Sequence, residues 1–121
     1  MNKALSILGV ATVAQAGAAV YGNKICVSNM AGFVMKWHQI DMMTAYESSW
    51  TDTYPIDQMK CQDMTAIPDI HNGSLVDIEV KAILGSTKKG SSAVVYDDTQ
   101  NVTITFSCTG TTLNYSCKVN G

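Results

Sequence analysis

The sequence predicts an all-β protein, an antiparallel β-sandwich of seven or eight short strands held together by disulfides. Several stretches alternate apolar and polar residues with a period of two, which is typical of a strand with one buried face. Turn-forming residues separate these stretches at intervals of roughly 8 to 15 residues, as in sandwich proteins. The cysteines are even in number: Cys26, Cys61, Cys108 and Cys117.

The clearest alternation is SLVDIEVKAIL at 74–84. A period of two assigns alternate residues to opposite faces of the strand. The expected core-facing residues are Val76, Ile78, Val80, Ala82 and Leu84. The expected solvent-facing residues are Asp77, Glu79 and Lys81.

Three further strands are expected at 31–40, 101–108 and 113–119. Their predicted core-facing residues are Phe33, Met35 and Trp37; Val102, Ile104, Phe106 and Cys108; and Leu113, Tyr115, Cys117 and Val119. Shorter strands are expected at 24–29, 55–61 and 92–97. Residues 41–55 are predicted to be either a long connection or a broken edge strand, and GSTKKGSS, which holds Lys88 and Lys89, to be a turn.

The N-terminus has the layout of a secretory signal peptide. Lys3 precedes an apolar run at 4–13 that is too short to span a bilayer, and Ala14-Gln15-Ala16 provides a small-residue cleavage site. We therefore expect a signal peptide at 1–16, cleaved within a few residues of Ala16, followed by a single domain at 17–121 that is secreted to the extracellular space.

In an extracellular chain, four cysteines predict two disulfides. Cys108 and Cys117 share the inward parity of neighbouring strands, which favours the pairs Cys108–Cys117 and Cys26–Cys61. The two other connectivities remain open. The chain has no CxxC pair and no His/Cys cluster, so we expect neither a metal site nor a cofactor.

Three Asn-x-Ser/Thr triplets begin at Asn72, Asn101 and Asn114. Each is a candidate glycosylation site in a eukaryotic secreted protein. The alternative is that a chain rich in Ser, Thr and Asn contains such triplets by chance.

The charge balance argues against one class of partner. The formal net charge is −2 at pH 7 and the chain contains no arginine. Nucleic-acid binding depends on clustered Lys and Arg, so a nucleic-acid partner is not expected.

Methionines and aromatic residues are concentrated between residues 30 and 64, which hold six of the seven methionines. Such side chains are favoured at partner surfaces, and they also fill irregular cores. The candidate binding residues lie in or beside the irregular segment: Met42, Met43, Tyr46, Trp50 and Tyr54. The partners considered are an extracellular protein, a glycan, a membrane surface or copies of the protein itself.

No catalytic constellation is recognisable. Both histidines, His38 and His71, are expected at the surface, and no catalytic residues are assigned. The carboxylates considered for a small hydrolase are placed by location only: Asp41, Glu47, Asp52 and Asp57.

The segments NMAGFVMKW (29–37), YPIDQMKCQD (54–63) and TGTTLNYSCKV (109–119) resemble a group of small secreted microbial β-sandwich proteins. The resemblance implies the fold and secretion. Three functions are considered in order: a secreted, non-enzymatic binding protein, such as an effector-like or toxin-like surface module; a subunit that self-assembles into an extracellular fibre or coat; and a small hydrolase.

Overall fold

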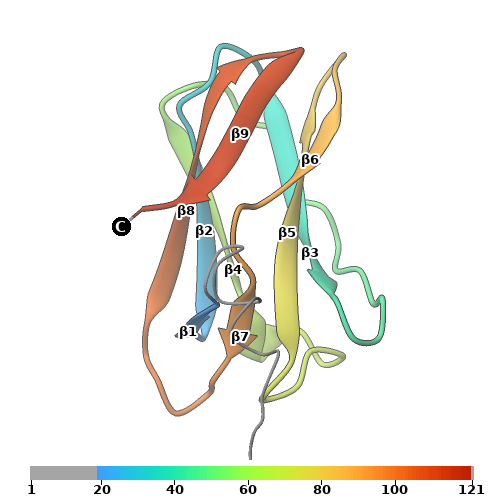
Figure 1. Ribbon diagram of the computed structural model, residues 1–121, viewed down its shortest axis with the longest axis vertical. Helices are drawn as coiled ribbons and strands as arrows, with labels where there is room; N and C mark the ends of the chain where they lie inside the picture. Colours follow the sequence, from blue (N-terminus) through green and yellow to red (C-terminus); the bar gives the residue numbers. More distant parts are fainter. Residues whose placement is uncertain (1–18, 121) are drawn as a thin grey trace, which may run out of the picture.

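Two β-sheets face each other in the computed structural model, which describes residues 19–120 (Figure 1). A single turn of 3-10 helix, η1 (Met64–Ala66), follows the fourth strand. The nine strands are β1 (Val20–Gly22), β2 (Lys24–Asn29), β3 (Met35–Asp41), β4 (Gln58–Asp63), β5 (Leu75–Ala82), β6 (Thr87–Lys89), β7 (Val94–Tyr96), β8 (Thr103–Thr111) and β9 (Asn114–Val119).

The predicted all-β sandwich is confirmed, but its sheets are mixed. One sheet has the order β1-β7-β5-β3, with β6 also paired to β5, and the other has the order β4-β2-β8-β9. The β1–β7 and β2–β8 pairs are parallel and the remaining pairs are antiparallel. Parallel neighbours require a long crossover. Strands that intervene in the sequence provide it in both cases, so alternation alone does not reveal these pairings.

The core lies between the sheets and contains most of the residues predicted to face it. Val76, Ile78 and Val80 of β5 are fully buried, as are Trp37 and Phe106. The prediction of a core position is wrong for three residues, because each lies just outside its strand. Leu84 is 96% exposed, Leu113 82% and Val102 40%.

Other differences concern the outer faces and the strand ends. His38, expected at the surface, is buried, and so is Asp77. The predicted turn around Lys88 and Lys89 contains the short strand β6, although both lysines are exposed. The fourth strand begins at Gln58 instead of residue 55, and β1 was not predicted.

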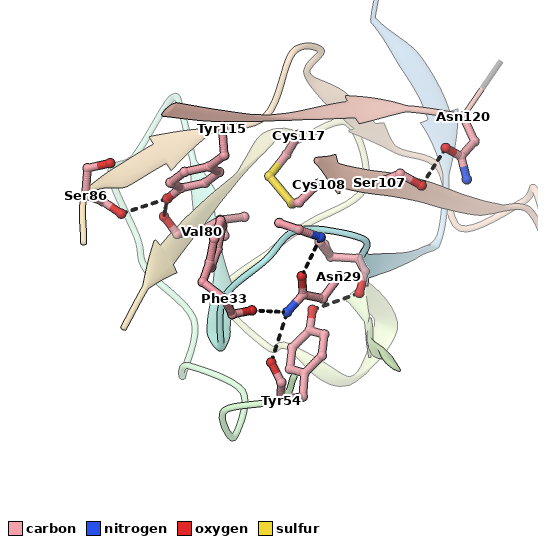
Figure 2. Close-up of a disulfide and its surroundings, with 12 residues drawn as sticks. Asn29, Phe33, Tyr54, Val80, Ser86, Ser107, Cys108, Tyr115, Cys117 and Asn120 are labelled. Atoms are coloured by element: carbon pink, nitrogen blue, oxygen red, sulfur yellow. Dashed lines mark hydrogen bonds between the residues drawn. A yellow bond between two sulfur atoms is a disulfide. The ribbon is translucent and has the colours of Figure 1, made fainter. Parts of the chain in front are cut away.

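The two disulfides are the favoured pairs, Cys26–Cys61 and Cys108–Cys117. Each joins residues directly opposite each other in an antiparallel register. Cys108 and Cys117 belong to the core cluster, as their parity predicted, and Figure 2 shows this bridge beside Tyr115. Cys26 lies between the core residues Ile25 and Val27, so its parity places the other bridge on the outer face of its sheet.

The expected signal peptide, residues 1–16, lies outside the described residues. Within 19–120, none of the helical structure is long and apolar enough to cross a membrane.

Candidate recognition surface

Residues 42–57, which we call the connection, link the two sheets. After β3 the chain turns back along the free edge of that strand and then enters β4 (Figure 1). Isolated bridges pair Ile40 with Glu47 and Met35 with Tyr54. The connection is therefore a broken edge strand, the second of the two alternatives that the sequence left open.

A tight turn begins the connection and exposes two methionines. The Asp41 carboxylate accepts hydrogen bonds from the backbone N–H groups of Met43 (2.9 Å) and Thr44 (3.2 Å). Ala45, at φ 64°, then donates its N–H to the Asp41 carbonyl oxygen at 2.8 Å. With the turn fixed in this way, Met42 is 50% and Met43 75% exposed.

Trp50 covers His38, the buried histidine that the sequence had predicted at the surface. The Trp50 and His38 rings are stacked, with centroids 3.7 Å apart, and the Lys36 ammonium lies 4.9 Å from the Trp50 ring centroid. His38 Nδ1 is 3.0 Å from the Ser48 carbonyl oxygen, and Nε2 is 2.8 Å from Glu79 Oε1. Both ring nitrogens lie within hydrogen-bonding distance of an oxygen, and which of them donates depends on the tautomer. This cluster fixes the position of Trp50.

Tyr54 and Tyr46 differ from the expectation of an exposed contact residue. Tyr54 is 1% exposed, and its hydroxyl donates to the Val27 carbonyl oxygen at 2.8 Å. Burial raises the pKa of Tyr54 well above its usual value. Tyr46 is half-buried against the core. Of the five candidate binding residues, Met42, Met43 and Trp50 are therefore the exposed ones.

A polar seam joins the connection to β4. Gln62 accepts from Ser48 Oγ and from the Gln39 amide, both at 3.2 Å, and donates to the Ser49 carbonyl oxygen at 2.9 Å. Gln39 is fully buried, and its Oε1 has no hydrogen-bond partner within the described part of the chain. Such an acceptor is normally satisfied by a water molecule or a ligand.

Three surface hollows have a wall in the connection. The first, about 330 Å³, lies between the connection, β4 and η1. The second, about 490 Å³, lies along β4 beside Thr51 and Asp52. The third, about 250 Å³, lies between Met43 and the turn at 71–74. The first is lined by Tyr46, Ser48, Ser49, Gln62, Asp63, Ala66, Ile67 and Pro68.

The carboxylates considered for a hydrolase are not gathered in one hollow. Asp41 lines the third hollow and Asp52 the second, whereas Glu47 and Asp57 line none of the three. No cluster of three or more potential metal ligands occurs among residues 19–120. None of these three hollows therefore holds two of the four carboxylates.

One buried carboxylate has a perturbed acidity. Desolvation raises the pKa of Asp77 to about 6, an effect that the Ile78 N–H and the charge of Lys89 partly oppose. Asp77 is 7% exposed and pairs with Ile40 near the start of the connection.

The three candidate glycosylation residues Asn72, Asn101 and Asn114 are all exposed. Asn72 also accepts a hydrogen bond from the Asp98 backbone N–H at 2.9 Å. Their use as acceptors stays a prediction.

A comparison of the chain with known protein families and with curated protein sequences found no match.

Proposed function

We propose that the protein is a secreted, non-enzymatic recognition protein whose connection binds an extracellular protein or glycan. The observation that carries the proposal is that the connection lines three hollows and also presents Met42, Met43 and Trp50 at the surface. Hydroxyl, amide and carboxylate groups beside exposed methionine and aromatic side chains suit adaptable recognition. The two disulfides are consistent with an extracellular location.

Binding to a glycan array and to immobilised extracellular-matrix proteins tests this proposal. We expect a signal that falls at least tenfold when Met42 and Met43 are both replaced by Ser, or when Trp50 is replaced by Ala, because burying an apolar side chain contributes on the order of 1.5–3 kcal/mol. Tyr54 is unsuitable for this test, since its replacement would disrupt the core.

Val102→Ser is the matched control, because Val102 is an exposed apolar residue outside the connection. Circular dichroism establishes that each variant is folded. Equal binding by the wild type and the connection variants, or no binding to any probe, would contradict the proposal.

A second function, self-assembly into a fibre or coat, is favoured by the place of β4 at the end of its sheet. An edge strand presents backbone groups that can pair with another chain. Negative-stain imaging of the purified protein tests this alternative. Ordered polymers that disappear on Met59→Pro, a change that removes a backbone donor within β4, would favour it over the monomeric recognition protein.

A further inference from the structure

Three segments, 30–34, 83–87 and 109–114, meet at the end of the sandwich where β3 begins, remote from the end of β3 that leads into the connection (Figure 1). The second forms the tip of the β5–β6 hairpin and the third the tip of the β8–β9 hairpin. We call these segments together the hairpin end. The inference drawn from it is independent of the proposed role of the connection.

Backbone contacts hold the three segments together. The Gly32 N–H donates to the Gly110 carbonyl oxygen at 3.1 Å, and the Ile83 N–H donates to the Val34 carbonyl oxygen at 2.9 Å. The loop from β2 to β3 is therefore bonded to both hairpins.

The two hairpin tips also touch each other directly. A Cβ atom added at Gly85 would lie 2.5 Å from Cγ2 of Thr112 and 2.9 Å from its carbonyl oxygen, so only glycine permits this approach. The Tyr115 hydroxyl donates to the Ser86 carbonyl oxygen at 2.7 Å, as Figure 2 shows. The Cys108–Cys117 disulfide links the same two strands next to Tyr115. The tips are thus fixed relative to one another before any partner binds.

The hairpin end exposes aliphatic side chains and carries no ionised ones. Leu84 is 96% exposed, Leu113 82%, Met30 48% and Val34 41%. No Asp, Glu, Lys, Arg or His occurs in the three segments, and their polar groups are hydroxyls and an amide. Transfer of these segments out of water therefore requires no desolvation of a charge.

Leu84 occupies a position in a turn where the backbone conformation favours glycine or asparagine. The Gly85 N–H donates to the Ala82 carbonyl oxygen at 2.9 Å, which makes Ile83 and Leu84 the central residues of a turn. Leu84 has φ 67°, and Gly or Asn is preferred at such a position. A large aliphatic residue is therefore held, fully exposed, where glycine would be more stable.

Cations flank the hairpin end. Lys88 and Lys89 are exposed in β6, and Lys81 is exposed in β5 opposite Thr87. Glu79 of β5 is paired with Lys89, and on the loop that adjoins Met30 the Asp57 N–H donates to the Asn29 carbonyl oxygen. Uncharged aliphatic tips bordered by lysines match the interface of a bilayer that contains anionic lipids.

We propose that the hairpin end docks on an anionic lipid bilayer, with the Leu84 and Leu113 side chains entering the interface and Lys88 contacting the headgroups. None of the three hollows is lined by these residues, so the surface offers no described pocket for a protein side chain. Protein interfaces also tend to be centred on aromatic or Arg residues, and none is exposed here. A bilayer requires no shape complementarity, which makes it the partner that the chemistry favours.

Flotation with vesicles of phosphatidylcholine, with and without a minor fraction of phosphatidylserine, tests the proposal on the full chain expressed through a secretory route. We expect the wild type to float with the anionic vesicles. Leu84→Gly and Leu113→Ser should each lower the partition constant at least tenfold, because each change removes a leucine side chain that would be buried in the bilayer interface. Lys88→Gln should weaken binding to the anionic vesicles but not any binding to phosphatidylcholine alone.

Val102→Ser provides the control, since Val102 precedes β8 at its far end and its replacement should not change flotation. All variants share the same N-terminus, so differences between them report on the hairpin end. Leu84→Gly suits the backbone at that position, so unfolding should not explain its loss of binding. The proposal is overturned if the wild type does not float or if the leucine variants float equally well. It is also overturned if those variants abolish a dimer seen by sedimentation while vesicle binding is absent.

Membrane docking also predicts whether Asn114 is glycosylated. Asn114 is next to Leu113 and is a candidate glycosylation residue. A glycan there would keep the tip out of a bilayer. We therefore expect intact-mass analysis of the secreted protein to show Asn114 unmodified, and a fully occupied Asn114 would contradict membrane docking.

Discussion

The connection and the hairpin end both expose large apolar side chains, but their local structures differ. The connection follows the β3 edge through isolated bridges and a seam of side-chain hydrogen bonds. The hairpin end consists of the tips of two regular hairpins and the loop 30–34, and the two tips are in contact. The connection surrounds its exposed residues with hollows and polar groups, whereas the hairpin end is an uncharged projection. The two regions thus suit different kinds of partner.

Each region is stabilised by its own disulfide. Removing these bridges should lower the free energy of unfolding more than the other substitutions considered below. Cys26–Cys61 anchors β4, into which the connection leads, and spans 35 residues of sequence; Cys108–Cys117 spans 9. The loop-entropy relation gives about 4 kcal/mol for the longer span and about 3 kcal/mol for the shorter. Replacing Cys26 and Cys61 by Ala should therefore lower the free energy of unfolding more than replacing Cys108 and Cys117, as measured by urea denaturation.

Because Cys108 and Cys117 lie in the core, their truncation also leaves a small cavity. A larger loss from the Cys108–Cys117 pair would mean that packing at the hairpin end outweighs chain entropy, and the ranking of the two regions would be reversed.

Asn29 links the two regions, and its substitution should give the next largest loss in the free energy of unfolding. Its side-chain amide donates to the carbonyl oxygens of Phe33 (2.7 Å) and Tyr54 (3.1 Å), while its Oδ1 accepts from the Ala31 N–H at 2.9 Å (Figure 2). Asn29→Asp replaces both donors with a buried charge that faces two carbonyl oxygens. We expect a loss of about 3 kcal/mol in the free energy of unfolding.

The matched control for this change is the same substitution at the exposed Asn101, which should alter stability by less than about 0.5 kcal/mol. Native-state hydrogen exchange adds a regional readout. Loss of protection at both the loop 30–34 and the last part of the connection would show that Asn29 couples them, and loss at one alone would show that the regions are independent.

Much of the fold was predictable because alternation records burial directly. The alternation at 74–84, 101–108 and 113–119 correctly predicted β5, β8 and β9 and, within these strands, their inner faces. The inward parity that Cys108 and Cys117 share correctly favoured their pairing, which left Cys26 with Cys61. The errors at Leu84, Leu113 and Val102 arise because a period of two does not show where a strand ends. In each case an apolar residue continues the alternation beyond the end of the strand and is exposed in the fold.

The candidate site was less predictable than the fold. The concentration of methionine and aromatic residues identified the connection, but composition does not separate Tyr54, in the core, from Trp50, at the surface. His38 was misplaced because parity does put it on the outer face, and the connection then folds over that face. Its burial depends on residues of the connection that are distant in sequence and show no periodicity.

Asp77 makes the end of the sheet near the connection sensitive to pH, a property with no counterpart among the uncharged hairpin tips. Its folded-state pKa of about 6 exceeds the ordinary value of 3.8. The raised pKa contributes stability that is complete below pH 3.8 and is lost as the pH rises through about 6. Asp77→Asn should therefore stabilise the protein by about 2 kcal/mol at pH 7 and have little effect near pH 3.5, since Asn still accepts from the Ile78 N–H. Urea denaturation at both pH values measures this, and an equal effect at the two would refute the assignment.

Replacing Leu84 by Gly should give the smallest change in the free energy of unfolding. It also compares the two regions directly, because each contains at least one non-glycine residue with positive φ. Leu84 has φ 67° at the hairpin end, and Ala45 has φ 64° in the turn that begins the connection. Relief of this backbone conformation by glycine should raise the free energy of unfolding by about 1 kcal/mol at either site. Leu84→Gly removes a side chain that is 96% exposed, so the gain should not be offset by lost packing, and the Ala45→Gly gain should be similar. Thermal unfolding of both variants measures the gains. If Leu84→Gly instead destabilises the protein, then Leu84 makes contacts within the fold, and its exposure no longer supports a role in docking. Stabilisation with loss of vesicle binding would show that this leucine serves the partner at a cost to the fold.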